Sequence, residues 1–204
     1  QPTRRWGHKQ QENLFLQQFH KHLLERTITA LEDPFHEREF QAMTFLAEPE
    51  VIKDMKITFV GDILHSRVAR SNIWGLTKLG AQVTVCGPKT LLPFDVEKLG
   101  VRVTTNLKEA VKDADVINLL RIQLERQKDS YFPSIREYAT AYQINRSILE
   151  KAKPDVLIMH PGPVNRGIEI TSEIVDGPLS VILDQVTNGL AVRMAVLFLL
   201  SGSS

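Results

Sequence analysis

Short apolar runs alternate with amphipathic stretches along most of this chain, from residue 56 to the C-terminal region. The apolar runs, which are rich in β-branched residues, cover positions 56–60, 82–86, 101–103, 115–120, 156–159 and 181–183. Runs that stay apolar over their whole length are typical of parallel strands covered on both faces. The pattern therefore predicts an α/β domain over residues 51–204, in which a parallel sheet carries helices on both faces and right-handed crossovers join the strands.

The stretches between these runs carry helix start and stop signals. The clearest predicted helix spans residues 66–79 and ends before Gly80, a residue type common just after a helix. Asn145 and either Thr105 or Asn106 are the expected N-caps of two shorter helices. The remaining predictions are short helices at 95–99, 107–112 and 146–151, a long closing helix at 186–200, and an irregular stretch at 127–143.

The first 50 residues follow a different pattern. Apolar side chains recur with nearly the 3.6-residue period of a helix over positions 13–31, and Pro34 ends that stretch. A second helical piece is predicted at 37–46, before Pro49. We expect a helical N-terminal arm over residues 1–50, which packs on the sheet domain or on another subunit and is too short to form a second α/β domain.

Composition excludes several classes of protein. With 43% hydrophobic and 24% charged residues and a formal net charge of +1, the 204-residue chain is typical of a soluble globular protein. It has no overall field that would attract nucleic acid or an anionic membrane. No apolar stretch approaches the roughly 20 residues that span a bilayer, and the N-terminus has no signal-peptide core. We expect a cytoplasmic protein, or one in an organelle stroma, with no nucleic-acid partner and no membrane contact.

The chain offers no recognisable metal or cofactor motif. Its one cysteine, Cys86, lies inside an apolar run, which indicates a buried core thiol and excludes an internal disulfide. The histidines do not have metal-binding spacing. Residues 61–66 hold one glycine, so neither the dinucleotide fingerprint nor the phosphate loop is present. We therefore expect no metal and no cofactor.

Arginines follow two of the predicted strands. Arg67 lies in the first turn of the helix after the first strand, and Arg121 directly follows the run at 116–120. Ligands collect at the carboxyl ends of parallel strands, and the planar guanidinium group matches a carboxylate with two hydrogen bonds. These positions predict a clamp for a small molecule with two carboxylates. Gln123 and Arg126 either hold Arg121 in place or share the ligand, since such a clamp has to be preset.

Each arginine also has a purely structural interpretation. Arg67 fits an exposed helix arginine in a surface ion pair. Arg121 fits a strand-end cation paired with Glu125 or Asp62. The sequence pattern by itself leaves these alternatives open.

A stiff loop follows the run at 156–159. In this loop, which begins His160-Pro161-Gly162-Pro163, the two prolines fix φ and have no N–H to donate. The carbonyl groups of Pro161 and Gly162 are therefore candidates to face a ligand, and they suit an amine. His160 is either a general base or a structural histidine at a strand end.

Four segments together resemble the aspartate carbamoyltransferase family. They are VGDILHSRVARSN at 60–72, LRIQLER at 120–126, MHPGPVNRG at 159–167 and QVTNGLAVRMA at 185–195. They occur in the family's order, and the resemblance covers residues 56–201, the aspartate-binding half of the catalytic chain. It implies a Rossmann-like α/β fold and the transfer of a carbamoyl group from carbamoyl phosphate to the L-aspartate amine, a step of pyrimidine biosynthesis.

The resemblance also implies roles for the candidate residues. Arg67 would bind the α-carboxylate of L-aspartate, and Arg121, assisted by Gln123, its side-chain carboxylate. Pro161 and Gly162 would place backbone carbonyls near the attacking amine and the carbamoyl nitrogen. The supporting residues would be Glu125, Arg126 and His160. Related ornithine enzymes carry a cysteine where this loop has Pro161, which favours aspartate as the substrate.

The family's motifs for carbamoyl phosphate are not found in this chain. The Ser-Thr-Arg-Thr phosphate loop and the His-Pro-Thr-Gln segment have no match before residue 56. We therefore expect this chain to bind aspartate at most, and to meet carbamoyl phosphate only if a second domain or chain supplies that site. The family also implies a homotrimer. The alternatives are a non-catalytic binding or assembly module on the same fold, and a carbamoyltransferase with another amino-acid acceptor.

Overall fold

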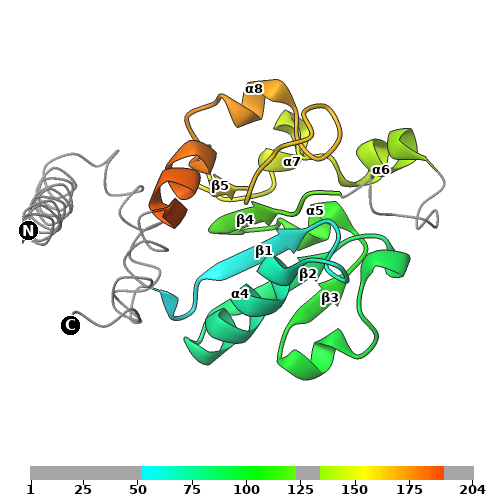
Figure 1. Ribbon diagram of the computed structural model, residues 1–204, viewed down its shortest axis with the longest axis vertical. Helices are drawn as coiled ribbons and strands as arrows, with labels where there is room; N and C mark the ends of the chain where they lie inside the picture. Colours follow the sequence, from blue (N-terminus) through cyan, green and yellow to red (C-terminus); the bar gives the residue numbers. More distant parts are fainter. Residues whose placement is uncertain (1–51, 123–133, 191–204) are drawn as a thin grey trace, which may run out of the picture. The chain divides into compact units, whose positions relative to one another are not determined.

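A five-stranded parallel sheet forms the centre of the computed structural model, which describes residues 52–122 and 134–190 (Figure 1). These residues belong to one compact unit, Phe45–Ser204. The sheet order is β3-β2-β1-β4-β5, and every neighbouring pair is parallel. The strands are β1 (Lys56–Val60), β2 (Gln82–Cys86), β3 (Arg102–Thr104), β4 (Val116–Leu119) and β5 (Leu157–Met159).

Five of the six predicted strands are confirmed, and the sixth is wrong. The run at 181–183 does not form a strand: Ser180 makes a single bridge to Ile158, and residues 182–190 are helical. Ile182 is buried, whereas the Leu183 side chain is 81% exposed. A short apolar run fits the start of a helix as well as a strand, and periodicity over three residues cannot separate the two.

The predicted caps of the two shorter helices are confirmed, with Asn106 capping α5 and Asn145 capping α7. Ser66, which was not predicted as a cap, also caps a helix: its side chain accepts from the Ala69 N–H at the start of α4. Gly80, just after α4, has a φ of +84°, as expected for a residue that ends a helix. These elements are α4 (Arg67–Lys78), η3 (Val96–Leu99), α5 (Leu107–Ala110) and α7 (Arg146–Leu149).

Three helical segments were not predicted. They are η2 (Lys89–Leu91), α6 (Ile135–Tyr142) and α8 (Ser172–Val175). Helix α6 lies inside the stretch predicted to be irregular, and Ser134 caps it by accepting from the Glu137 N–H. The N-terminal arm, residues 127–133 of the irregular stretch and the closing helix from residue 191 onward lie outside the described residues.

Helices cover both faces of the sheet, as predicted. The chain passes from β1 through α4 to β2 on one side, then returns from β3 through α5 to β4 on the other side of β1. Because both crossovers are right-handed, opposite directions of travel place α4 and α5 on opposite faces (Figure 1). The residues buried on α4 are Ala69, Ile73 and Leu76, and those on α5 are Leu107 and Ala110.

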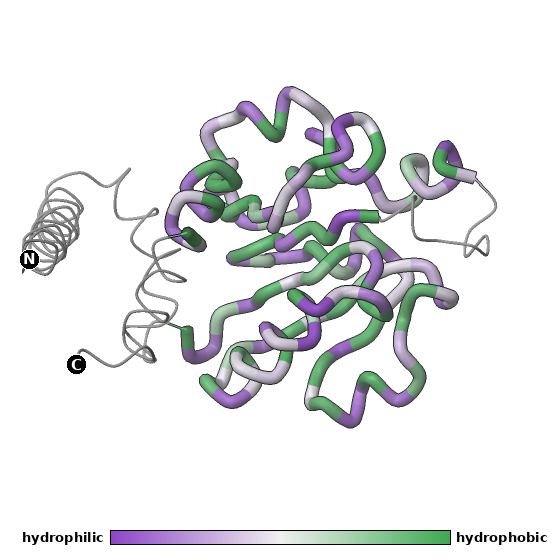
Figure 2. Tube along the Cα trace, viewed as in Figure 1, coloured by the Kyte–Doolittle hydropathy of each residue, from purple (hydrophilic) through white to green (hydrophobic). Residues whose placement is uncertain are grey.

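The strands supply the apolar core between these helices. All four residues of β4 are buried, as are four of the five in β1. Successive side chains of a strand point to opposite faces, so a continuously apolar strand meets helices on both sides. Figure 2 shows the hydrophobic positions along the strands and the hydrophilic ones in the turns that connect them.

The strand order creates a switch point between β1 and β4. The connections from these neighbouring strands leave in opposite directions, which opens a crevice at their carboxyl ends. Gly61, the first residue after β1, has a φ of +129°, and a Cβ added there would lie 2.8 Å from the Leu120 carbonyl oxygen. Glycine therefore lets the segment after β1 approach the end of β4 closely.

We expect a Gly61→Ala substitution to lower the free energy of unfolding by about 1–3 kcal/mol, because the new methyl group meets backbone at a φ that L-residues avoid. Gly75→Ala in α4 is the matched control, since its Cβ would have no neighbour within 4 Å. In that control variant we expect the free energy of unfolding to rise by about 0.5–1 kcal/mol, because alanine has a higher helix propensity than glycine. Urea unfolding of the two variants measures both values, and equal stabilities would contradict the close approach.

Candidate functional site

A cavity of about 370 Å³ opens at the carboxyl ends of the central strands. Its walls come from the segment after β1, the first turn of α4, the segment after β4 and the loop after β5. The lining residues are Asp62, His65, Ser66, Arg67, Val68, Arg121, Pro161 and Gly162. The cavity lies at the β1–β4 switch point, where open α/β sheets bind ligands.

Both predicted arginines line this one cavity. Arg67 is the first residue of the 12-residue helix α4, where the helix dipole favours anions. Arg121 follows β4 after Leu120, whose N–H donates to the Val60 carbonyl at 2.8 Å and so extends the sheet. The backbone of each arginine is thus set by an element of regular structure. Pro161 and Gly162 line the same cavity, so the structure brings four of the predicted residues together.

Asp62 is a buried carboxylate on the cavity wall, with 2% of the residue exposed. Its two oxygens both lie 3.0 Å from His65 Nδ1, and Oδ1 also accepts from the His65 N–H at 3.0 Å. Asp62 thus orients His65, a cavity residue that the sequence reasoning did not single out. Glu125, the other partner considered for Arg121, lies outside the described residues, as do Gln123 and Arg126.

His160 is fully buried, and both of its ring nitrogens are engaged. Nδ1 accepts from the Gly162 N–H at 2.9 Å, and Nε2 lies 3.1 Å from Glu169 Oε2. The His160 N–H donates to Gln185 Oε1 at 2.8 Å. These contacts support the structural interpretation of His160, because a general base needs a ring nitrogen that can reach the substrate.

Glu169 is the residue beneath this site that the sequence reasoning missed. It is 0% exposed, and its carboxylate accepts from the Ile122 N–H at 2.7 Å and from the Asn165 side chain at 2.7 Å. It also accepts from the Asn165 N–H at 2.9 Å. The available signal was a single acidic residue between Ile168 and Ile170 in an apolar stretch. A buried carboxylate is costly unless it accepts hydrogen bonds, so its presence at a buried position indicates specific hydrogen-bond donors around it.

Arg166, in the same loop, points to a different partner. Its Nη1 and Nη2 donate to the two carboxylate oxygens of Asp176 at 2.6 and 2.8 Å. The hydrogen bond from Arg166 lowers the pKa of Asp176. Both side chains are exposed, so this pair ties the loop to the end of α8 at the surface.

Cys86, at the end of β2, is a buried thiol as predicted. Burial, with a smaller effect of the Glu109 charge, raises the pKa of Cys86 to about 12. Within residues 52–122 and 134–190 there is no group of three or more His, Cys, Asp or Glu side chains that could hold a metal ion. In the same residues no helix is long and apolar enough to cross a membrane.

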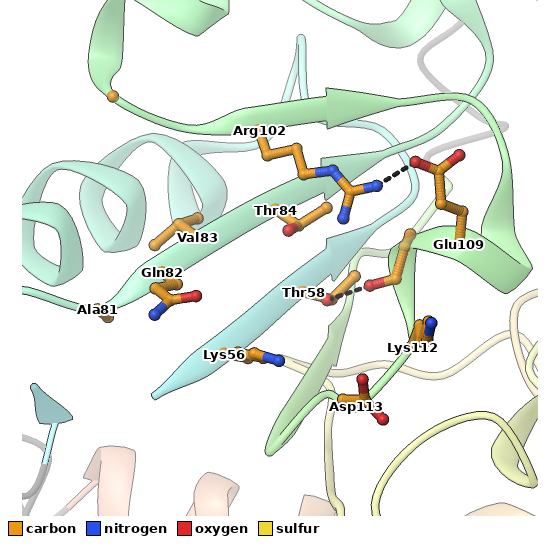
Figure 3. A pocket seen from close by; sticks show the side chains of 12 residues that line it. Lys56, Thr58, Ala81, Gln82, Val83, Thr84, Arg102, Glu109, Lys112 and Asp113 are labelled. Carbon is orange, nitrogen blue, oxygen red and sulfur yellow. Dashed lines mark hydrogen bonds and ion pairs between the residues drawn. The ribbon is translucent and has the colours of Figure 1, made fainter. Parts of the chain in front are cut away.

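A second, larger cavity of about 690 Å³ lies toward the amino ends of the strands. Its lining includes the first residues of β1, β2 and β3, namely Lys56, Gln82 and Arg102. Figure 3 shows that Arg102 is paired with Glu109. The Thr58 hydroxyl donates to the Ala110 carbonyl. These polar groups connect α5 to the sheet, which is a structural role.

Comparisons with known proteins agree with this geometry. The model of the aspartate/ornithine carbamoyltransferase Asp/Orn binding domain matches residues 53–200. The aspartate carbamoyltransferase catalytic subunit of Syntrophus aciditrophicus (strain SB) is 55% identical over 186 residues, which are 89% of this chain and 61% of that protein. The subunit of the same name from Endomicrobium trichonymphae is 56% identical over 172 residues, 82% of this chain and 55% of that protein.

The solved structures lead to the same family. The ornithine carbamoyltransferase from Pyrococcus furiosus is similar with a TM-score of 0.60 and 33% sequence identity, covering 72% of this chain and 49% of that one. Fold and cavity thus define an α/β domain with a cavity at its switch point. The chain belongs to the aspartate/ornithine carbamoyltransferase family, through the Asp/Orn binding domain, which confirms the predicted resemblance. It spans 61% and 55% of the length of the two relatives above.

We expect Cys86 in the folded protein to resist a thiol reagent such as dithiobis(nitrobenzoate) at about pH 8. A pKa of about 12 leaves the thiol protonated at that pH, and burial blocks access. Unfolding in guanidinium should release one equivalent, because the chain has 1 cysteine. Absorbance of the released thiolate measures both states, and rapid labelling without denaturant would contradict the placement of Cys86 in the core.

Proposed function

We propose that the cavity at the β1–β4 switch point binds L-aspartate. The observation that carries this proposal is the presence of Arg67 and Arg121, from two distant segments, on the wall of one small cavity. A guanidinium group donates two parallel hydrogen bonds to a carboxylate, so two of them suit a ligand with two carboxylates. Arg67 would bind the α-carboxylate and Arg121, assisted by Gln123, the side-chain carboxylate. In this proposal Glu125, Arg126 and His160 support the site.

The charges of the site favour aspartate over ornithine. Aspartate carries two carboxylates near neutral pH, whereas ornithine carries one carboxylate and a second cationic group. A second ammonium beside two arginines would be repelled, and like charges in a partly buried site cost more than in water. The relatives from Syntrophus aciditrophicus and Endomicrobium trichonymphae are named aspartate carbamoyltransferase catalytic subunit, which supports the same choice.

The reaction we propose for the complete enzyme is carbamoyl transfer in pyrimidine biosynthesis. The neutral amine of aspartate attacks the carbamoyl carbon of carbamoyl phosphate, and a C–N bond forms. The C–O bond to phosphate breaks, phosphate leaves with the electron pair, and the amine nitrogen loses a proton. The carbonyl groups of Pro161 and Gly162 would accept hydrogen bonds from the amine and the carbamoyl nitrogen, which orients them for attack.

The groups that bind carbamoyl phosphate are proposed to come from a second domain or chain. This chain matches 61% of the Syntrophus aciditrophicus relative, so part of that protein has no counterpart in the match. The relatives are named catalytic subunits, and we propose that this chain also acts in an assembly, a homotrimer.

Titration calorimetry with succinate, a dicarboxylate without the amine, tests the binding site. We expect Arg67→Ala and Arg121→Ala each to weaken succinate binding by about 10- to 100-fold, because each removes a charge-assisted pair of hydrogen bonds. Arg70→Ala is the matched control: Arg70 lies one turn further along α4, is exposed, and does not line the cavity. The control should bind succinate like the unsubstituted chain.

Two outcomes of this titration would contradict the proposal. If the unsubstituted chain gives no heat with succinate, the domain is better explained as a binding or assembly module. If all three arginine variants weaken binding equally, the effect reflects general charge and not a clamp.

A carbamoylation assay tests the proposed reaction. We expect product from aspartate and carbamoyl phosphate only when a carbamoyl-phosphate domain is added to this chain, because transition-state groups for the phosphate and the carbamoyl oxygen are needed for rate. A panel of other amino acids serves as the control for the acceptor. Robust turnover by this chain alone would contradict the proposal that the groups binding carbamoyl phosphate come from a second domain or chain.

A further inference from the structure

Four hydrogen-bond donors surround the carboxylate of Glu169. The Ile122 N–H and the Asn165 side-chain amide reach Oε1, each at 2.7 Å. The Asn165 N–H and the His160 ring nitrogen Nε2 reach Oε2, at 2.9 and 3.1 Å. Of the side chains that fit this space, an ionised carboxylate alone accepts at every one of these contacts, since a glutamine would present an NH₂ group to one pair of donors.

One branch of this network fixes the orientation of the Pro161–Gly162 peptide. The Gly162 N–H donates to His160 Nδ1 at 2.9 Å, so Nδ1 carries no proton and the neutral ring carries its proton on Nε2. That proton points to Glu169, 3.1 Å away. In a trans peptide the N–H and C=O groups are antiparallel, so the Pro161 carbonyl points away from His160.

The other branch fixes the residue that follows Arg121. The Ile122 N–H donates to Glu169, and the Ile122 carbonyl accepts from the Asn165 side chain at 3.1 Å. Both backbone groups of Ile122 are therefore held by residues of the loop after β5. The partners Ile122 and Glu169 are 47 residues apart in sequence, so this contact joins the segments that follow the paired strands β4 and β5.

We propose that Glu169 is the positioning residue of the aspartate site, holding Arg121 and the Pro161 carbonyl at a fixed separation. This inference rests on the proposed function. A rigid supporting layer matters because a binding group displaced by about 1 Å loses much of its effect. Glu169 acts through Ile122 and His160 and lies fully buried, so it would position the site without touching the ligand.

The test combines Glu169→Gln with a matched substitution at Glu173, an exposed residue of α8. In Glu169→Gln an NH₂ group replaces one oxygen: at the Oε1 position it faces the Ile122 N–H and the Asn165 amide, and at the Oε2 position it faces the Asn165 N–H and His160 Nε2. In either orientation at least one hydrogen bond of the network is lost. We expect succinate binding by the full chain to weaken by about 10-fold or more. We also expect faster hydrogen exchange at the Ile122 amide, the Gly162 amide or both, according to which position the NH₂ group takes. Glu173→Gln should change neither quantity.

Nitrogen NMR of the unsubstituted chain provides a measurement that needs no variant to fold. We expect the His160 ring to be neutral with its proton on Nε2, and a proton on Nδ1 would overturn the inference. Unchanged succinate affinity and amide exchange in Glu169→Gln would overturn it as well, and would leave the proposed function standing. Absence of succinate binding by the unsubstituted chain would instead contradict the proposed function, while the ring tautomer and amide exchange would still test the Glu169 network.

Discussion

The parallel pairing of β1 with β4 is the constraint on which the site depends. Its register places Val60 beside Leu119, and the ladder continues one residue further through the Leu120 N–H, which donates to Val60 at 2.8 Å. The two segments that leave these strands therefore start from fixed neighbouring points. Arg67 lies on a helix and Arg121 at a strand end, and sites built on regular elements hold their geometry better than sites on loops.

A buried carboxylate beneath the proposed anion-binding cavity looks unfavourable, yet it satisfies buried hydrogen-bond donors. The Asn165 N–H of the loop after β5 and the Ile122 N–H of the segment after β4 both need an acceptor inside the protein, and both donate to Glu169. Glu169 accepts from four donors, and these hydrogen bonds offset the cost of burying the charge. The same contacts join two loops, so the stability of this region and the spacing of the proposed binding groups have a common origin.

Local signals explain which features could be predicted. The five confirmed strands are compact β-rich runs, and Ser66 and Asn145 are capping residues followed directly by helices. Helix α6 had the same kind of signal in Ser134, but its charged residues obscured the apolar face on which Tyr138 is buried. Glu169 could not be assigned a role, because its contact with Ile122 depends on the folded arrangement of residues 47 positions apart.

The rigidity of the elements that hold Arg67 and Arg121 affects which ligand the proposed site prefers, as well as how tightly the site binds it. A flexible pair of cations would bind any small dicarboxylate, since each arginine could follow its carboxylate. In the proposed site, cations whose backbones are set by α4 and by the end of β4 would select for the distance between the two carboxylates. An acid with one more methylene group would then have to bend or displace a strand end, and either change costs free energy that the shorter aspartate does not lose. If the proposed site discriminates by length, the buried Glu169 network that holds the segment after Arg121 contributes to it beside the two charges.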